Sequence, residues 1–314
     1  MNGVIVLNKP AGISSNTAAN IVKKLTGAKK AGHLGTLDVL GDGVLPITLG
    51  KSTRLFDFFL QKRKTYHAVF AFGFKTSTLD AEGEITDVNL KEISKQQIEN
   101  ELPNFIGKIK QLPPQFSALK VNGKVAYELA RKGEKIDLKE REVEIFSFKL
   151  IGKPSSEKLN ELKERFLEFH SEKEFEEKNL GKVFENQLFE FEIECSAGTY
   201  IRSLCRDLSH NTASCGAMLC ITRTKCGKFD IKNSFTLDEI KNGKYELLSS
   251  FDVVDLPVLS LSGEEGKAIL DGKSVFKLPV LSGQFKLVCG NRFFGIANNF
   301  DNGKIKVETF LLEE

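Results

Sequence analysis

Asp38 is the residue of this chain whose surroundings most favour a chemical role. It stands in the glycine-rich stretch Gly32–Pro46, where glycines let the backbone turn sharply or approach a ligand closely. The side chains next to it are apolar: Leu34, Leu37, Val39 and Leu40. A carboxylate among apolar groups is unfavourable unless a cation or hydrogen-bond donors hold it, so Asp38 needs a partner. Spacing alone leaves two interpretations open, a common turn aspartate or a reactive carboxylate.

Spacing also argues against two other kinds of site. Leu49–Ser52 resembles the end of a phosphate-binding P-loop, but the first glycine of that pattern would stand at position 45, which is leucine. The six cysteines form no Cys-x-x-Cys pair, which argues against a zinc knuckle or a dithiol redox centre. We therefore expect no metal and no cofactor, in a cytoplasmic protein with reduced cysteines.

The distribution of charge favours a phosphate-rich partner. The net charge is only +3, but residues 1–70 contain ten Lys or Arg and three Asp. A single charge run is usually a solvated surface, whereas a basic first quarter of the chain favours nucleic acid. No segment reaches the roughly 18 apolar residues that a membrane-spanning helix needs, so we expect no membrane partner.

The elements that must position Asp38 include both strands and helices, which predicts an α+β fold. Apolar runs and alternation predict strands at 4–7, 66–74, 143–145 and 189–195. Caps and periodic apolar residues predict helices at 15–27, 94–102, 125–131 and 201–208. The first of these helices is expected to have Ser15 or Asn16 as its N-cap, and a glycine-rich loop is expected over 32–50.

Two segments differ in character from the rest. Residues 155–178 are nearly all Glu, Lys and Ser. Their sparse apolar residues recur at helical spacing and predict one amphipathic helix in a surface excursion: Leu159, Leu162, Phe166 and Phe169. From about Phe251, short apolar runs separated by Gly, Asn and Asp indicate a small β-rich domain.

Five further motifs follow the stretch around Asp38 in a fixed order. They are Lys64–Tyr66, Pro113–Lys124, Ala126–Gly133, Ser196–Leu204 and Ile221–Thr224. In this order and register the chain resembles the bacterial TruB family, the tRNA pseudouridine-55 synthases, from Gly3 to about Phe229. The resemblance implies a mixed, mostly antiparallel sheet of pseudouridine-synthase type in a catalytic domain at 1–245, with a charged insertion near 153–182. It also implies a small β-rich, PUA-like RNA-binding domain at 250–314.

The resemblance implies roles for single residues as well. It places the family's catalytic aspartate on Asp38, its active-site tyrosine on Tyr66, and the arginine that pairs with the aspartate on Arg202. Taken alone, Tyr66 at the start of a strand is expected to be a half-buried sheet residue. Arg202 alone is open between the role in the site and a surface salt bridge, for instance to Asp207 or a glutamate. The implied substrate-binding residues are His33, which fills the space that a flipped nucleotide leaves, and Ile221 near the base. We also expect Tyr200 to bind substrate, and the concentration of basic residues beside the Asp38 stretch favours phosphate contacts by Lys9 and Lys64.

These residue types suit pseudouridine formation. In this reaction the N1–C1′ bond of a uridine breaks, the uracil turns over, and C5 is joined to C1′. An opposite charge at ~4–6 Å keeps a carboxylate ionised, as the reaction requires. The tyrosine can stack on the uracil and place its hydroxyl for proton transfer. Whether the carboxylate attacks C1′ or C6, or abstracts the 2′ proton, stays open. The implied partner is the T-arm stem-loop of tRNA, bound by a monomer that flips the uridine out of its stack.

The loop departs from the family pattern beside the aspartate. Val39 stands where relatives have proline, and Asp42 adds a second carboxylate. We expect Asp42 to face solvent, because two close ionised carboxylates would raise the pKa of one of them.

Two other functions compete with this interpretation. A non-catalytic RNA-binding protein on the same scaffold would have lost part of the Asp38, Tyr66 and Arg202 set, which is intact. An RNA uridine C5-methyltransferase would need a reactive cysteine and a glycine-rich nucleotide-cofactor loop. No such glycine pattern is present, and the cysteines lie outside the glycine-rich stretch.

Overall fold

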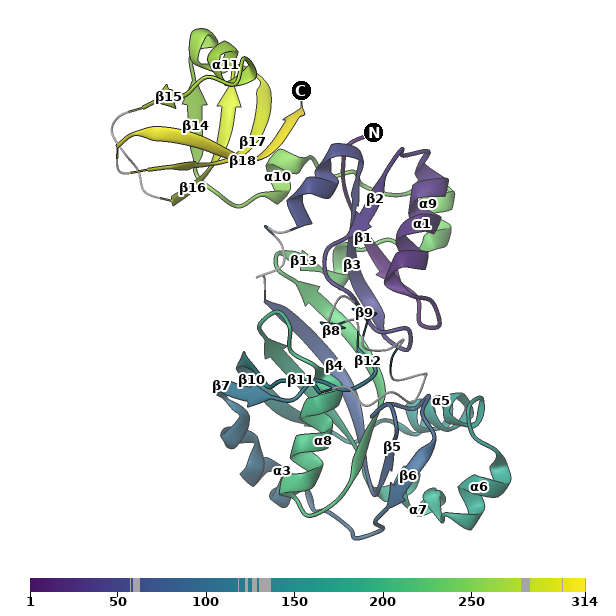
Figure 1. Cartoon of the computed structure of the whole chain (residues 1–314). Helices are drawn as coiled ribbons and strands as arrows, with labels where there is room; N and C mark the ends of the chain where they lie inside the picture. The colour runs from purple at the N-terminus through teal and green to yellow at the C-terminus, as the bar shows by residue number, and fades with distance from the viewer. Residues whose placement is uncertain are drawn as a thin grey trace.

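A nine-stranded sheet forms the centre of the protein (Figure 1). The computed structural model describes residues 1–56, 58, 63–117, 119–121, 124–125, 129, 137–277, 283–300 and 302–313. The strands of this sheet are β1 (Gly3–Lys9), β2 (Ala31–His33), β3 (Asp42–Leu49), β4 (Lys64–Phe72), β7 (Gly107–Gln111), β10 (Arg141–Gly152), β11 (Leu188–Cys195), β12 (Gly216–Cys226) and β13 (Phe229–Asp230).

The order of the strands is β1-β3-β12-β4-β11-β10-β7, with β2 paired to β3 and β13 paired to β12. The pairing of β3 with β12 is parallel, and the other pairings described for this sheet are antiparallel. The predicted mixed, mostly antiparallel sheet is therefore confirmed.

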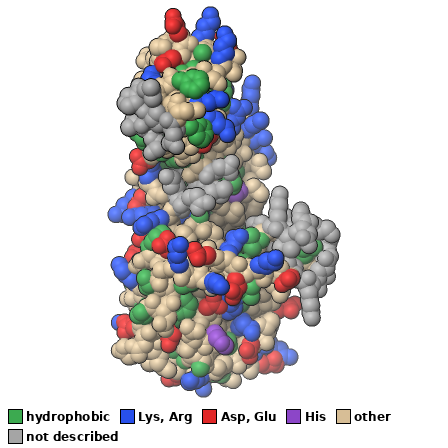
Figure 2. Space-filling view, turned by 60° about the vertical axis from the view of Figure 1, so that its left-hand side comes forward, with side chains coloured by type: hydrophobic (Ala, Val, Ile, Leu, Met, Phe, Trp, Pro, Cys, Tyr) green, Lys and Arg blue, Asp and Glu red, His purple; other side chains and the backbone are tan. Residues whose placement is uncertain are grey.

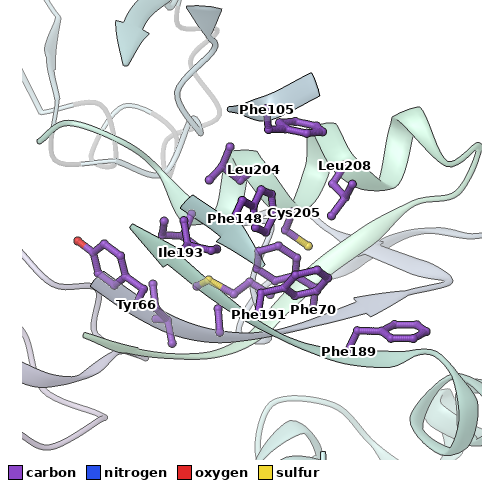
Figure 3. Packing of buried hydrophobic residues seen from close by; sticks show 14 of the residues in the cluster. Tyr66, Phe70, Phe105, Phe148, Phe189, Phe191, Ile193, Leu204, Cys205 and Leu208 are labelled. Atoms are coloured by element: carbon purple, nitrogen blue, oxygen red, sulfur yellow. The ribbon is translucent and has the colours of Figure 1, made fainter. Parts of the chain in front are cut away.

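Alternating side chains of the central strands build a first hydrophobic core. Phe70 of β4 and Phe191 of β11 lie with ring centroids 4.7 Å apart. Helix α8 (Ile201–Asn211) covers this face of the sheet with Leu204 and Leu208 (Figure 3). Helix α3 (Lys95–Glu101) and the 3₁₀ helix η2 (Leu102–Phe105) pack on the same core, and Ser94 caps α3 as predicted. The core side of the sheet thus fixes the first turn of α8, which carries Arg202.

A second layer covers the other end of the sheet. Helix α1 (Ser15–Thr26) and the short helix α9 (Leu237–Lys241) pack against β1 and β3. The predicted N-cap of α1, Ser15 or Asn16, is wrong by one or two residues, because Ser14 has the extended backbone of a cap and accepts a hydrogen bond from the Thr17 N–H. Gly27 ends the helix in the left-handed conformation.

The glycine-rich stretch is a shorter loop than the predicted 32–50. Strands β2 and β3 take both of its ends, so only residues 34–41 are irregular; we refer to these as the aspartate loop. β3 forms because its apolar side chains are fully buried: Val44, Leu45, Ile47 and Leu49. Gly43, with φ 98°, allows β3 to approach β12, since a Cβ there would lie 2.4 Å from the carbonyl oxygen of Arg223.

The charged insertion is not the single surface helix that we expected. It forms α5 (Ser156–Leu167), α6 (Glu172–Glu177) and α7 (Leu180–Asn186). Leu162 and Phe166 are buried in a second hydrophobic core with Phe74, whereas Phe169 is 46% exposed. The prediction of a surface excursion is therefore wrong, because these helices cover the face of the sheet opposite α8 with their apolar sides. Two short strands, β5 (Phe74–Thr76) and β6 (Ile85–Val88), lie beside them (Figure 1).

The predicted β-rich C-terminal part is confirmed. Its five strands have the order β14-β16-β17-β18-β15. Their bounds are β14 (Val258–Leu261), β15 (Val275–Phe276), β16 (Gly283–Cys289), β17 (Arg292–Asn299) and β18 (Lys304–Glu313), with α10 (Ser250–Val253) and α11 (Gly263–Leu270). Phe293 and Leu311 share a hydrophobic cluster with Val4 and Val6 of β1. The Arg54 guanidinium also donates to the Phe310 carbonyl at 2.6 Å, so this part is attached to the larger sheet.

The remaining elements are short. They are the 3₁₀ helices η1 (Gly50–Leu55) and η3 (Ile231–Asn233) and the paired strands β8 (Lys120–Val121) and β9 (Lys124–Val125). The predicted helix at 125–131 lies almost entirely outside the described residues, although Val125 itself is in β9. Within the described ranges, the helices are too short or too polar to cross a membrane.

Candidate active site

Asp38 and Arg202 form an ion pair across a large separation in the sequence. The Arg202 Nη2 donates to Asp38 Oδ1 at 3.1 Å, and Nε lies 3.1 Å from Oδ2. Asp38 stands in the aspartate loop, and Arg202 in the first turn of α8. The Arg202 side chain is 7% exposed and the Asp38 side chain 38%, so the cation is enclosed while the carboxylate reaches the surface. The surface partner considered for Arg202, Asp207, is instead paired with Arg206 at 2.7 Å.

A second carboxylate, Asp80, lies against the same guanidinium and was missed by the sequence reasoning. Arg202 Nη1 is 3.2 Å from Asp80 Oδ2. Asp80 is buried, and it accepts hydrogen bonds from the Thr78 hydroxyl and the Glu82 N–H. Burial raises the pKa of Asp80 even though Arg202 and these donors oppose the shift. In the sequence, the segment around Asp80 has the composition of a polar turn. The one feature that could have indicated a held carboxylate is the hydroxyl of Thr78, two residues earlier.

Arg202 is held in one orientation by four partners. Besides the two carboxylates, Nη1 donates to the Thr78 carbonyl and Nη2 to the Phe116 carbonyl, both at 3.0 Å. Burial acts to lower the pKa of Arg202, but Asp38 and Asp80 outweigh it and the pKa is raised. The guanidinium therefore stays charged and keeps one edge directed at Asp38.

Hydrogen bonds to its backbone carbonyls fix the aspartate loop. Every carbonyl oxygen from Gly35 to Leu40 accepts one. Arg223 of β12 donates to the first two carbonyls at 3.2 and 3.3 Å, and the Ser15 hydroxyl to Leu37 at 2.9 Å. The carbonyl of Val39 accepts from the Gly12 N–H at 2.8 Å. A loop held at successive peptide groups presents its side chain in one place, as a catalytic group requires.

Two predicted substrate-binding lysines are inside the protein. Lys9 is fully buried, and its ammonium donates to the carbonyls of Pro10 and Ile13 at 2.8 and 2.7 Å. Burial lowers the pKa of Lys9 to about 8, against the opposing charges of Asp42 and Asp38. Lys64 is also buried, which lowers its pKa. Full burial and these backbone partners contradict a direct contact of the Lys9 ammonium with an RNA phosphate, and Lys9 instead supports the turn beside the aspartate loop.

Tyr66 and Ile221 face the aspartate loop from the central strands. Tyr66 of β4 is paired with Arg223 of β12, and its hydroxyl points away from the packed phenylalanine rings (Figure 3). Burial raises the pKa of Tyr66, and the positive charge of Arg223 opposes that shift. Ile221 packs on the loop so closely that a Cβ at Gly41 would lie 3.0 Å from its Cγ2. Arg223 belongs to a motif that we had noted, but its burial under the loop was not predicted.

The other predicted residues occupy the ends of nearby elements. His33 ends β2 with its Nε2 3.2 Å from the Asn16 side chain, and burial lowers the pKa of His33. Tyr200 precedes α8 and exchanges two hydrogen bonds between its backbone and the Gln111 side chain. Burial raises the pKa of Tyr200. Asp42, expected to face solvent, is half-buried at the start of β3.

The arrangement suits nucleophilic or base chemistry by one accessible carboxylate. Asp38 is partly exposed, ion-paired and fixed at its backbone, whereas Asp80 is enclosed behind Arg202. In the part of the chain that the structure describes, no three or more His, Cys, Asp or Glu side chains form a group that could hold a metal ion.

Comparison with known proteins gives consistent similarities. Residues 23–174 match the sequence model of a family described as TruB family pseudouridylate synthase (N terminal domain). The tRNA pseudouridine synthase B of Caulobacter vibrioides is 32% identical, over 89% of this chain and 83% of that protein. The protein of the same name from Francisella tularensis subsp. holarctica is 34% identical, over 97% of this chain and 93% of its own.

Solved structures share the fold at lower identity. A chain from a crystal structure of a Cbf5–Nop10–Gar1 complex superposes with a TM-score of 0.66 at 20% identity, over 98% of this chain and 84% of that chain. A chain from an H/ACA RNP bound to a substrate RNA containing 2′-deoxyuridine gives the same TM-score at 18% identity, over 99% of this chain and 85% of that chain.

Proposed function

Because the chain belongs to the TruB family of pseudouridylate synthases, we propose that it converts uridine 55 in the T-loop of tRNA to pseudouridine. It is an isomerase, and its relatives over most of the chain are named for action on tRNA. The observation that carries the proposal is the ion pair of Asp38 with Arg202, because it presents one oriented and accessible carboxylate.

We assign the chemical step to Asp38. The reaction breaks the bond between N1 and C1′, turns the uracil over, and joins C5 to C1′; C5 then loses its proton and the released N1 gains one, so the product is an isomer of the substrate. Attack on C1′, attack on C6 and abstraction of the 2′ proton all require a carboxylate that is ionised at neutral pH. Arg202 orients Asp38 in each case. Because Asp80 is enclosed on the other side of Arg202, Asp38 is the carboxylate of the pair that can reach a base.

Tyr66 is proposed to contact the flipped uracil. Its ring can stack on the base, and its hydroxyl, whose pKa is raised by burial, is protonated and can donate a hydrogen bond. Ile221 would border the base, and Tyr200 and His33 would contact RNA around it. Burial favours the neutral form of His33, which suits insertion into the stack that the uridine leaves.

Exposed lysines of the N-terminal layer are the proposed phosphate contacts. Lys24, Lys29 and Lys30 at and beyond the end of α1 are exposed, unlike Lys9 and Lys64. Figure 2 shows Lys and Arg side chains along one edge of the upper half of the molecule. Phosphate contacts of this kind give affinity without sequence specificity. The C-terminal β-rich part, starting near residue 250, is proposed as a second, PUA-like RNA-binding domain.

Two of the buried cysteines, Cys195 and Cys220, do not suit the competing methyltransferase function. Burial raises the pKa of Cys195 to about 12 and that of Cys220 to about 11, so these thiols stay protonated and unreactive.

A T-arm stem-loop RNA alone is expected to be a substrate. The proposed contacts involve one flipped uridine and nearby phosphates, which a stem-loop contains in full. Purified protein is incubated with the stem-loop, and pseudouridine is measured by nucleoside mass spectrometry. The control is the same stem-loop with cytidine in place of uridine 55, which should yield no product. Modification only of whole tRNA would contradict the proposed mode of recognition.

A further inference from the structure

The helices of the charged insertion contact both loops that carry the carboxylates around Arg202. From α5, the Arg165 Nη2 donates to the carbonyl of Leu40 at 2.7 Å. Leu40 follows Asp38 by two residues in the aspartate loop. Beyond the end of α5, the His170 Nε2 donates to the carbonyl of Ala81 at 2.9 Å. Ala81 directly follows Asp80, so one insertion holds the backbone beside each carboxylate.

Apolar packing anchors the same two points. Leu40 and Ala81 are both buried members of the hydrophobic core that the insertion forms with the sheet. Phe166 is at the centre of this core and is fully buried. The ring of His170 stacks on Phe166 with centroids 4.0 Å apart, which orients Nε2 toward the Ala81 carbonyl. Each loop therefore places an apolar side chain in this core, and its backbone carbonyl accepts a hydrogen bond from a side chain of the insertion.

In the described part of the chain, Arg165 holds a carbonyl near the end of the aspartate loop that neither β12 nor the N-terminal layer holds. The carbonyls of Gly35 and Thr36 accept hydrogen bonds from β12. The carbonyls of Leu37 and Val39 accept hydrogen bonds from the N-terminal layer. Leu40, just before Gly41, is held from the insertion. The charge of Arg165 also acts on Glu82, together with the charges of Arg202 and Asp38.

We propose that Arg165 and His170 are positioning residues, which act through the backbones of Leu40 and Ala81 to keep Asp38 and Asp80 on the two sides of Arg202. This inference rests on the proposed function. A hydrogen bond from a charged donor is stronger than a neutral one, and a catalytic group displaced by about 1 Å can lose up to roughly 10²-fold in rate. The insertion is thus a built-in support of the active site rather than an appendage.

Arg165→Met and His170→Phe test the proposal with little disturbance of packing. Methionine keeps the length of the Arg165 stem, and phenylalanine keeps the ring that stacks on Phe166. Each substitution is expected to lower the single-turnover rate of pseudouridine formation by roughly 10-fold. The Kd for the stem-loop should change by less than about twofold, because neither residue is proposed to touch RNA. Arg165→Lys should recover part of the rate, since an ammonium can donate to the Leu40 carbonyl.

Hydrogen–deuterium exchange gives a second readout that does not depend on activity. Exchange of residues 34–41 should rise in Arg165→Met, and exchange of residues 76–83 should rise in His170→Phe. The control is Lys173→Met, which removes a positive charge from α6 at a side chain that is 83% exposed. It should match the wild type in rate and in exchange.

The two proposals fail in different ways. Wild-type protein that forms no pseudouridine would contradict the proposed function, and the exchange data would still decide whether the insertion fixes the loops. If the wild type is active, an unchanged rate and unchanged exchange in both variants would overturn the positioning role. A rate loss that merely parallels a fall in melting temperature, with no local rise in exchange, would overturn it as well.

Discussion

Replacing Asp38 by asparagine is expected to lower the rate of pseudouridine formation by at least about 10⁴-fold, with tRNA binding changed by less than about twofold. Asparagine has the same shape, but its amide can neither attack carbon nor accept a proton as a carboxylate does. The fold should survive, because Arg202 keeps Asp80 and the carbonyls of Thr78 and Phe116 as partners. The Asp38 side chain is partly exposed, so the substitution leaves no buried charge unpaired.

Single-turnover formation of pseudouridine and filter binding of the same RNA measure the two effects separately. Asp42→Asn is the matched control, because it removes a carboxylate four residues further along that lies outside the ion pair with Arg202. It should behave like the wild type. Normal product from Asp38→Asn would exclude Asp38 as the reacting group.

Replacing Arg202 by methionine is expected to abolish activity and to destabilise the fold at the same time. Loss of the guanidinium leaves Asp80 buried without its cation, a situation that costs roughly 3–5 kcal/mol. It also removes the guanidinium that orients Asp38, for which we expect a rate loss of at least about 10²-fold. The single variant cannot separate these two consequences.

A double variant separates them. In Arg202→Met with Asp80→Asn, the buried carboxylate is neutral, so most of the lost free energy of unfolding should return in urea denaturation. Activity should stay low, because Asp38 still lacks its partner. Arg206→Met serves as the control on the same helix, since Arg206 pairs with Asp207 on the outer side of α8. Recovery of activity together with stability in the double variant would show that Arg202 has a structural role alone.

The sequence predicted the elements that position the site better than the contacts within it. Helix α8 was readable because Leu204 and Leu208 recur at helical spacing, and Arg202 was noticeable because it lies off that stripe. Asp80 could not be found in this way. It sits in a turn, which has no periodicity, and its partner is brought close only by the packing of α8 on the sheet.

Burial of charged residues was the main source of error. Lys9 looked like a phosphate contact because the first quarter of the chain is basic, yet backbone carbonyls of the following turn compensate its ammonium inside the protein. Arg223 was one residue of a recognised motif, and nothing in its spacing showed that it would lie under the aspartate loop.

The insertion was predicted in part. The spacing identified Leu162 and Phe166 as the apolar side of a helix, and both are buried. The spacing also extended that helix to Phe169, where the chain instead turns before Ser171 caps the next helix. An amphipathic pattern shows that the apolar face of a helix must be buried, but it does not identify the surface against which that face packs. That surface is the back of the central sheet beside the aspartate loop.

The most direct test of the central claim is to map pseudouridine in unmodified tRNA transcripts treated with the purified protein, at nucleotide resolution. We predict one new pseudouridine, at position 55 of the T-loop, that is formed by the wild type and is absent with Asp38→Asn. Pseudouridine at a different uridine, or none in any tRNA, would contradict the account.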